Sequence, residues 1–144
     1  MVPAGLYCHI PFCKRKFPYC DFYSQTDLAA LPAFLTALQR ELALRCDPSL
    51  AVDTLYFGGG TPSLCPPGAV DALLAAAGAA FDLHPDAEIT LEANPGALHA
   101  GDLQHLRRAG VNRLNLGIQS FSNRNLRLLG RIHTRDAAVA AIEA

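Results

Sequence analysis

The sequence lacks tryptophan, an excess of either charge and any long apolar run. Lys and Arg total 12 against 13 Asp and Glu, a formal net charge of −1, so no basic surface predicts binding to nucleic acid or to an anionic membrane. The longest weakly polar run, 69–81, has 13 residues and contains Asp71, whereas a membrane-spanning helix needs about 20 apolar residues. The first residues, MVPAGLYCHIPF, contain no basic segment followed by an apolar stretch, so we expect no signal peptide.

Disulfide bonds are also not expected. The chain has five cysteines, an odd number at irregular spacing, whereas small disulfide-bonded domains carry an even set. Free or metal-bound thiols in a cytoplasmic protein fit this usage better. The 144 residues are 51% hydrophobic, which suits one domain of ordinary size with a core of its own.

A cysteine is missing from the most informative motif. Residues 13–20 read CKRKFPYC, and cysteines at the first, fifth and eighth positions would hold an iron–sulfur cluster by three irons and leave the fourth open. The fifth position is Phe17, whose side chain cannot ligate iron. Cys13 and Cys20 alone are a weak signal, because two cysteines at this spacing are often buried structural thiols.

Three other cysteines are candidates to replace the missing ligand. Cys8 lies on an expected first strand, where Tyr7 and His9 share one face, so an inward-facing Tyr7 would turn Cys8 toward the helices. Cys46 falls on the apolar stripe of an expected helix and is most simply a core side chain. Cys65 follows a glycine-rich turn and is the least implausible substitute.

Short apolar runs alternate with helical patterns along the chain. Strands are predicted at 6–9, 54–57, 88–92 and 113–119, and helices at about 28–45, 66–81, 101–109, 123–129 and from about 134. This order predicts parallel strands joined by right-handed helical crossovers.

Two strands alternate apolar and polar side chains, which bears on the shape of the sheet. In 88–92 the apolar Ile89 and Leu91 alternate with polar residues, and 113–119 repeats the pattern. Strands of a flat doubly wound sheet are usually apolar on both faces, so we expect an α/β fold curved into a partial (β/α) TIM-like barrel. About four βα units are present and cannot close a barrel, so we expect a fragment, or a truncated reading frame, of a longer protein.

Polar and glycine-rich segments follow the predicted strands, at the end where such barrels carry their active sites. The turn 58–62 reads GGGTP, and its glycines allow backbone N–H groups to approach a charged ligand. No Gly-Lys-Ser/Thr follows, so it is not a phosphate-binding loop. Glu92 can hold an ammonium or a ribose hydroxyl, Gln119 can bond a ligand, and Arg131 can pair with a carboxylate. Each feature also has a simpler interpretation without a ligand. The glycine segment is then only a tight turn, Glu92 and Gln119 are polar residues at strand ends, and Arg131 is a surface arginine.

Together these segments resemble the radical S-adenosylmethionine superfamily, in the group of oxygen-independent coproporphyrinogen III oxidases and HemW-type haem chaperones. The matching motifs are LYCHIPFC, PYCDF, YFGGGTPSLC, LEANPG, GVNRLNLGIQSF and LLGRIH. The resemblance implies that 1–144 is the N-terminal part of the core domain and that a C-terminal domain is absent. The oxidases carry a further cysteine just past the last ligand, whereas Asp21-Phe22 follow Cys20 here, which favours the chaperone branch.

The resemblance also implies a set of binding residues. Cys13 and Cys20 would ligate a [4Fe–4S] cluster, with Phe17 in place of the third ligand. Tyr7 would lie near the cluster-bound S-adenosylmethionine, and its amino-acid end would be bound by Gly59, Gly60 and Thr61. Glu92 would contact its ribose or amino group, and Tyr19 would be an aromatic contact. Gln119 and Arg131 would serve a nearby adenosylmethionine site.

The function implied is haem binding and delivery to acceptor proteins, with a defective cluster because of Phe17. The alternative is an oxidoreductase that decarboxylates coproporphyrinogen III anaerobically with a 5′-deoxyadenosyl radical. A degenerate fragment without a cofactor is a third interpretation.

Overall fold

Four parallel strands, each followed by helical segments, make up residues 2–144, which the computed structural model describes. The strands are β1 (Ala4–Ile10), β2 (Asp47–Gly59), β3 (Phe81–Ala93) and β4 (Arg113–Leu116). The helices are α1 (Leu31–Leu44), α2 (Pro67–Ala80), α3 (Ala100–Ala109), α4 (Asn123–Leu128) and α5 (Arg135–Glu143), with 3₁₀ turns η1 (Leu28–Ala30) and η2 (Pro62–Leu64). The sheet order β1-β2-β3-β4 and the parallel pairing confirm the predicted topology.

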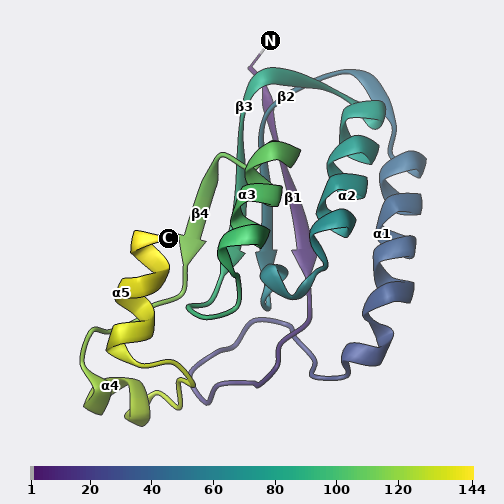
Figure 1. The fold of residues 1–144 in the computed structure, drawn as a ribbon. Helices are drawn as coiled ribbons and strands as arrows, with labels where there is room; N and C mark the ends of the chain where they lie inside the picture. Colours follow the sequence, from purple (N-terminus) through teal and green to yellow (C-terminus); the bar gives the residue numbers. More distant parts are fainter. Residues whose placement is uncertain (1) are drawn as a thin grey trace.

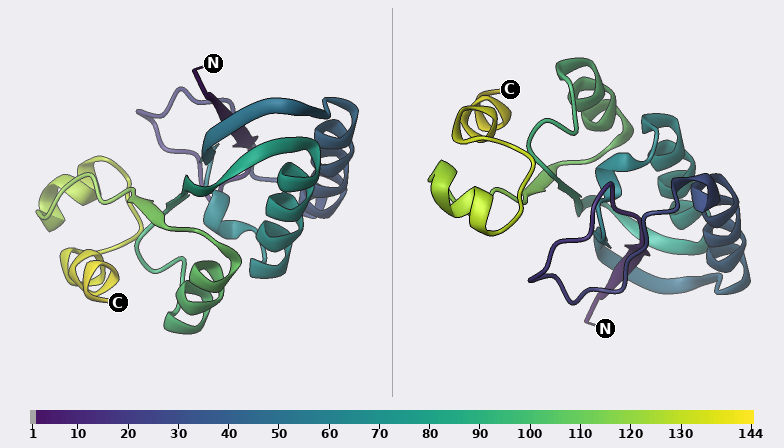
Figure 2. Two further views of the ribbon diagram at one scale, coloured as in Figure 1. Left: turned by 90° about the horizontal axis from the view of Figure 1, so that it is seen from above. Right: turned by 90° about the horizontal axis from the view of Figure 1, so that it is seen from below.

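The helices and the connecting loops occupy different places around the sheet. Helices α1, α2 and α3 lie along one face (Figure 1). The loop between β1 and η1 passes beneath the C-terminal strand ends, and α4 and α5 lie beyond β4 (Figure 2). The loop that carries the cysteine motif therefore meets the turns that follow β2, β3 and β4.

The strand register explains the alternation seen in the sequence. Cys8, Phe57 and Leu91 are neighbours across β1, β2 and β3, and none is more than 3% exposed. They belong to the core between the sheet and the helices. The preceding position on β1, Tyr7, faces the opposite side and is 55% exposed. The prediction that Cys8 faces the helices as a small core residue is confirmed.

Two expectations about local structure were wrong. The last strand was predicted to reach 119, but β4 ends at Leu116. Beyond it, Ile118 N–H donates to the Leu116 carbonyl and Ser120 N–H to the Ile118 carbonyl, and Gln119 adopts a left-handed φ of 69°. Hydrogen bonds within local turns therefore replace hydrogen bonds to β3 at Ile118 and Ser120, although apolar and polar residues continue to alternate in the sequence.

The other wrong expectation concerns Cys46. It was placed on the buried stripe of a helix, but α1 ends at Leu44 and Cys46 is exposed. The first helical turn is also separate, because η1 precedes Pro32 at the start of α1. Among residues 2–144, no helix has the length and apolar character needed to cross a membrane.

Candidate functional site

The predicted site residues meet in a pocket of about 270 Å³ at the C-terminal end of the sheet. Every one of them lines it except Tyr7. The lining members are Cys13, Tyr19, Cys20, Gly59, Gly60, Thr61, Glu92, Gln119 and Arg131. Segments separated by more than a hundred residues in the sequence therefore form one site.

Tyr7 lies on the open face of β1, beside the pocket. Its ring stacks on Tyr56, with centroids 5.9 Å apart and planes at 27°, and its hydroxyl lies 3.1 Å from Nδ1 of His9. Burial, followed by the charge of Glu92, raises the pKa of the Tyr7 phenol. The phenol therefore stays protonated on an aromatic surface next to the pocket.

The backbone N–H groups of the glycine turn are not free, contrary to the sequence-based expectation. Gly60 N–H donates to the Ile10 carbonyl at 2.9 Å, and Thr61 N–H donates to the Phe12 carbonyl at 2.7 Å. The glycine instead permits close approach, because a Cβ at Gly60 would stand 2.6 Å from the Phe12 carbonyl oxygen. The turn thus fastens the start of the cysteine loop to the end of β2.

Glu92 is oriented by donors on both carboxylate oxygens. Oε1 accepts a hydrogen bond from the Tyr56 hydroxyl at 2.7 Å, and Oε2 accepts one from Gly59 N–H at 3.1 Å. The amide of Asn115 donates in turn to the Tyr56 hydroxyl at 2.9 Å. Burial, followed by the hydrogen bond to Glu92, raises the pKa of Tyr56. The carboxylate therefore sits in a fixed position at the pocket wall, where its remaining lone pairs suit a cation or a hydroxyl.

A chain of side-chain hydrogen bonds connects the pocket to the cysteine loop. The Thr61 hydroxyl lies 3.7 Å from Cys13 Sγ as its donor, and Asn94 Nδ2 donates to Thr61 Oγ1 at 3.1 Å. Arg131 Nη2 donates to Asn94 Oδ1. The sequence places Asn94 within the LEANPG motif but indicates no role for it in the site. Its membership of that motif is the feature of the sequence that could have indicated a role in the site.

Phe17, the residue at the missing ligand position, is packed between side chains. The Arg131 guanidinium carbon lies 4.5 Å from the centroid of the Phe17 ring. On the aromatic side, the rings of Phe17 and Tyr19 stack with centroids 5.8 Å apart and planes at 10°. An apolar ring with this packing has a stable place in the pocket wall.

The donor set does not fit a cluster bound by three cysteines. Cys13 is 7% exposed and Cys20 is half-buried, and the position between them holds a phenyl ring. Burial raises the thiol pKa of both Cys8 and Cys65 to about 11, which opposes formation of the thiolate that binds iron. Among residues 2–144, no cluster of three or more His, Cys, Asp or Glu side chains could hold a metal ion.

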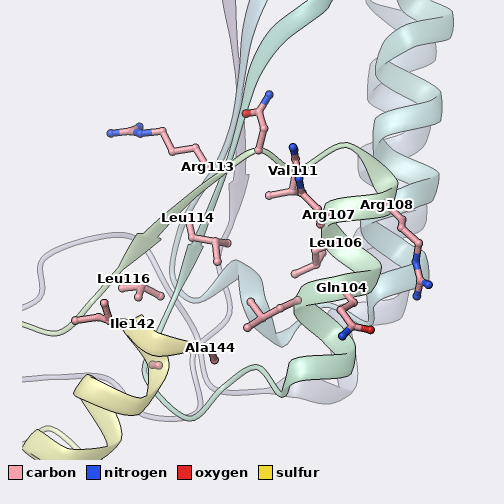
Figure 3. Close-up of a pocket in the computed structure, with 13 residues that line it drawn as sticks. Gln104, Leu106, Arg107, Arg108, Val111, Arg113, Leu114, Leu116, Ile142 and Ala144 are labelled. Carbon is pink, nitrogen blue, oxygen red and sulfur yellow. The ribbon is translucent and has the colours of Figure 1, made fainter.

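A second, larger pocket of about 740 Å³ lies between α3, β4 and α5 (Figure 3). Its walls are mainly apolar, with Leu106 and Leu114 pointing into it and Ile142, Arg107 and Arg113 among its other lining residues. No acid, histidine or cysteine lines it, and none of the predicted site residues does. We therefore place the candidate site in the smaller pocket.

Comparison with known proteins agrees with the fold and the motifs. The Radical SAM superfamily model matches residues 7–144. The chain is 44% identical over 137 residues to the heme chaperone HemW of Escherichia coli strain K12, covering 91% of this chain and 36% of the relative. It is 37% identical over 147 residues to an oxygen-independent coproporphyrinogen III oxidase of Bradyrhizobium diazoefficiens, covering 97% and 32%.

Among solved structures, the radical SAM enzyme coproporphyrinogen III oxidase (HemN) from Escherichia coli superposes with a TM-score of 0.87 at 30% identity. The match covers 98% of this chain and 33% of that one. This chain thus spans about a third of the length of these relatives, and the expected partial α/β fold of the radical SAM type is confirmed. The chain belongs to the radical SAM superfamily, in the group that contains HemW-type haem chaperones and oxygen-independent coproporphyrinogen III oxidases.

Proposed function

We propose that residues 1–144 form the N-terminal part of the radical SAM core of a HemW-type haem chaperone. Its role would be to bind haem and deliver it to acceptor proteins in the cytoplasm. The supporting observation is the 44% identity to a haem chaperone, together with Asp21-Phe22 after Cys20, where the oxidases carry a further cysteine. The alternative, a coproporphyrinogen III oxidase, is supported by the TM-score of 0.87 with such an enzyme.

The polar half of the pocket suits the amino-acid and ribose parts of S-adenosylmethionine. Glu92 presents a fixed carboxylate to an ammonium or a hydroxyl. Because the N–H groups at Gly60 and Thr61 are already bonded, we assign the turn's ligand contacts to carbonyl groups and close backbone packing rather than to free donors. Gln119 lines the pocket from its left-handed turn. Tyr19 lines the aromatic side of the pocket, and Tyr7 lies next to it.

The same pocket does not suit a stable [4Fe–4S] cluster in this chain. Two thiols, Cys13 and Cys20, flank a phenyl ring that already packs against Arg131 and Tyr19. Losing one of three thiolates leaves an iron without a protein ligand. The chain therefore lacks the ligand set that radical chemistry at such a cluster requires.

Anaerobic reconstitution with iron and sulfide tests this proposal. The unmodified chain should bind little iron and develop little visible iron–sulfur absorbance, whereas Phe17→Cys should gain both. Phe17→Ser is the matched control, because it removes the ring equally but supplies no thiolate. Full cluster occupancy in the unmodified chain would contradict the proposal and would point to Cys65 or Cys8 as the third ligand.

The choice between chaperone and oxidase needs the complete gene product, because this chain covers about a third of either relative. A haem chaperone should bind haem and transfer it to a haem-free acceptor protein, measured by the acceptor's haem absorbance. Anaerobic decarboxylation of coproporphyrinogen III without haem transfer would establish the alternative instead.

A further inference from the structure

Both terminal nitrogens of Arg131 donate hydrogen bonds within the protein, although the resemblance assigns this residue to a ligand. Its Nη1 donates to the Tyr19 hydroxyl at 3.2 Å, and its Nη2 donates to Asn94 Oδ1 and to the Gly117 carbonyl. One face of the guanidinium lies over the Phe17 ring. Nη2 has no donor left for a ligand carboxylate, whereas Nη1 keeps a second N–H, and the buried Nε has no hydrogen-bond partner among the described residues.

Asn94 connects Arg131 to the cysteine motif by hydrogen bonds. Its oxygen accepts from Arg131 and its nitrogen donates to Thr61 Oγ1, the donor to Cys13 Sγ. These partners fix which end of the amide faces which way, because a guanidinium offers only donors. The space is also tight, since a Cβ at Gly117 would stand 2.7 Å from Asn94 Oδ1.

The middle of the cysteine loop has little else to hold it. Its start is bonded through Cys13 N–H to the Gln25 carbonyl at 2.9 Å. In the segment 14–20, the one backbone hydrogen bond among described residues is internal, from Cys20 N–H to the Phe17 carbonyl. Contacts from side chains therefore decide whether this segment stays against the pocket.

We propose that Asn94 and Arg131 are positioning residues that hold the cysteine loop closed on the pocket through two separate arms. The first arm runs from Asn94 through Thr61 to Cys13. The second runs from Arg131 to the stacked rings of Phe17 and Tyr19, next to Cys20. This inference concerns the loop's conformation and stands whether or not the protein carries haem.

The five cysteines supply a built-in test of the proposal. In a pulse of N-ethylmaleimide at neutral pH, with each cysteine quantified by peptide mass spectrometry, exposed Cys46 reports full reactivity. Cys8 and Cys65 are buried in the core and report global unfolding. Cys13 and Cys20 report release of the loop.

Removing either positioning residue should release the loop selectively. In Asn94→Ala we expect the labelling rate of Cys13 to rise about fivefold, the change that corresponds to losing one neutral side-chain hydrogen bond, here the bond from Asn94 to Thr61. In Arg131→Lys the charge remains but the planar stack is lost, so Cys20 labelling should rise as well. Arg135→Lys is the matched control, because Arg135 is an exposed arginine whose guanidinium lies 4.0 Å from the carboxylate of the exposed Asp136, and no hydrogen bond or ion pair links it to the cysteine loop among the described residues.

Asn94→Asp separates the two arms. The carboxylate still accepts from Arg131 but offers no donor to Thr61, so Cys13 labelling should rise while Cys20 stays unchanged. Unchanged labelling of both thiols in Asn94→Ala and Arg131→Lys would overturn the proposal. So would a parallel rise at Cys8 and Cys65, because it would show that the substitutions unfold the whole domain rather than free the loop.

Discussion

Replacing Gly60 by alanine should destabilise the protein through a backbone clash at the mouth of the pocket. The new Cβ would lie 2.6 Å from the carbonyl oxygen of Phe12, 2.8 Å from its nitrogen and 2.9 Å from its carbonyl carbon. These are backbone atoms in a residue that is 0% exposed, so no side-chain rotation relieves the contact. The Phe12 carbonyl also accepts the 2.7 Å hydrogen bond from Thr61, which the displacement would lengthen.

The expected magnitude follows from three terms. Inserting a methyl group into a packed site costs about 1–3 kcal/mol, and weakening one backbone hydrogen bond costs about 1 kcal/mol. A Gly→Ala change also lowers the conformational entropy of the unfolded chain, which stabilises the folded protein by about 0.4–1 kcal/mol. Gly60→Ala should therefore lower the free energy of unfolding by about 1–3.5 kcal/mol, compared with the roughly 5–15 kcal/mol typical of a domain.

Urea unfolding followed by far-UV circular dichroism measures this change, and the chain offers a matched control. A Cβ at Gly78, in the last turn of α2, would meet nothing within 4 Å, and alanine is favoured over glycine in a helix by about 0.5–1 kcal/mol. The midpoint should thus fall for Gly60→Ala and rise slightly for Gly78→Ala. If Gly60→Ala proved neutral or stabilising, the close packing of the glycine turn on the cysteine loop would be refuted.

Two further outcomes are expected. Burial, followed by the charge of Arg131, lowers the pKa of His133 from its ordinary 6.5, so the unfolded state binds this proton more readily, and His133→Gln should reduce the stability lost as the pH falls below about 6.5. The edge of β4 is unpaired beside the apolar groove of Figure 3, so we expect association through 113–116 in light scattering after size exclusion, weakened by Leu114→Lys. A monodisperse, cooperatively melting monomer would refute that second expectation.

The strand order and the meeting of the motifs were predictable because both follow directly from periodicity. Alternation at Ile89 and Leu91 distinguishes the two faces of a strand, and helices between strands require parallel pairing. The C-terminal ends of parallel strands then lie at one edge. No detailed contact was needed to bring Glu92 and the glycine turn to the same pocket.

The structure differs from the sequence-based predictions where local backbone hydrogen bonds, or side chains distant in the sequence, determine the conformation. Residues 117–119 continue an alternating pattern, yet local turn bonds end the strand at Leu116. The pairing of Asn94 with Arg131 joins residues 37 apart in the sequence, and residue types alone do not reveal such partners. The N–H groups at Gly60 and Thr61 were expected to face a ligand, but whether a donor is free depends on the path of a neighbouring loop.

Membership of the superfamily and the capacity to hold its cluster are determined by different parts of this chain. The fold rests on the helix-covered face of the sheet, where Phe57 and Leu91 are each 1% exposed. Phe17 lies in the pocket at the C-terminal ends of the strands, where it packs against Arg131 and Tyr19 rather than against that core. A phenyl ring can replace a thiolate there without disturbing the sheet. Melting measurements will therefore not distinguish a chain that can form a cluster from one that cannot, whereas iron content, visible iron–sulfur absorbance and thiol accessibility at this loop will.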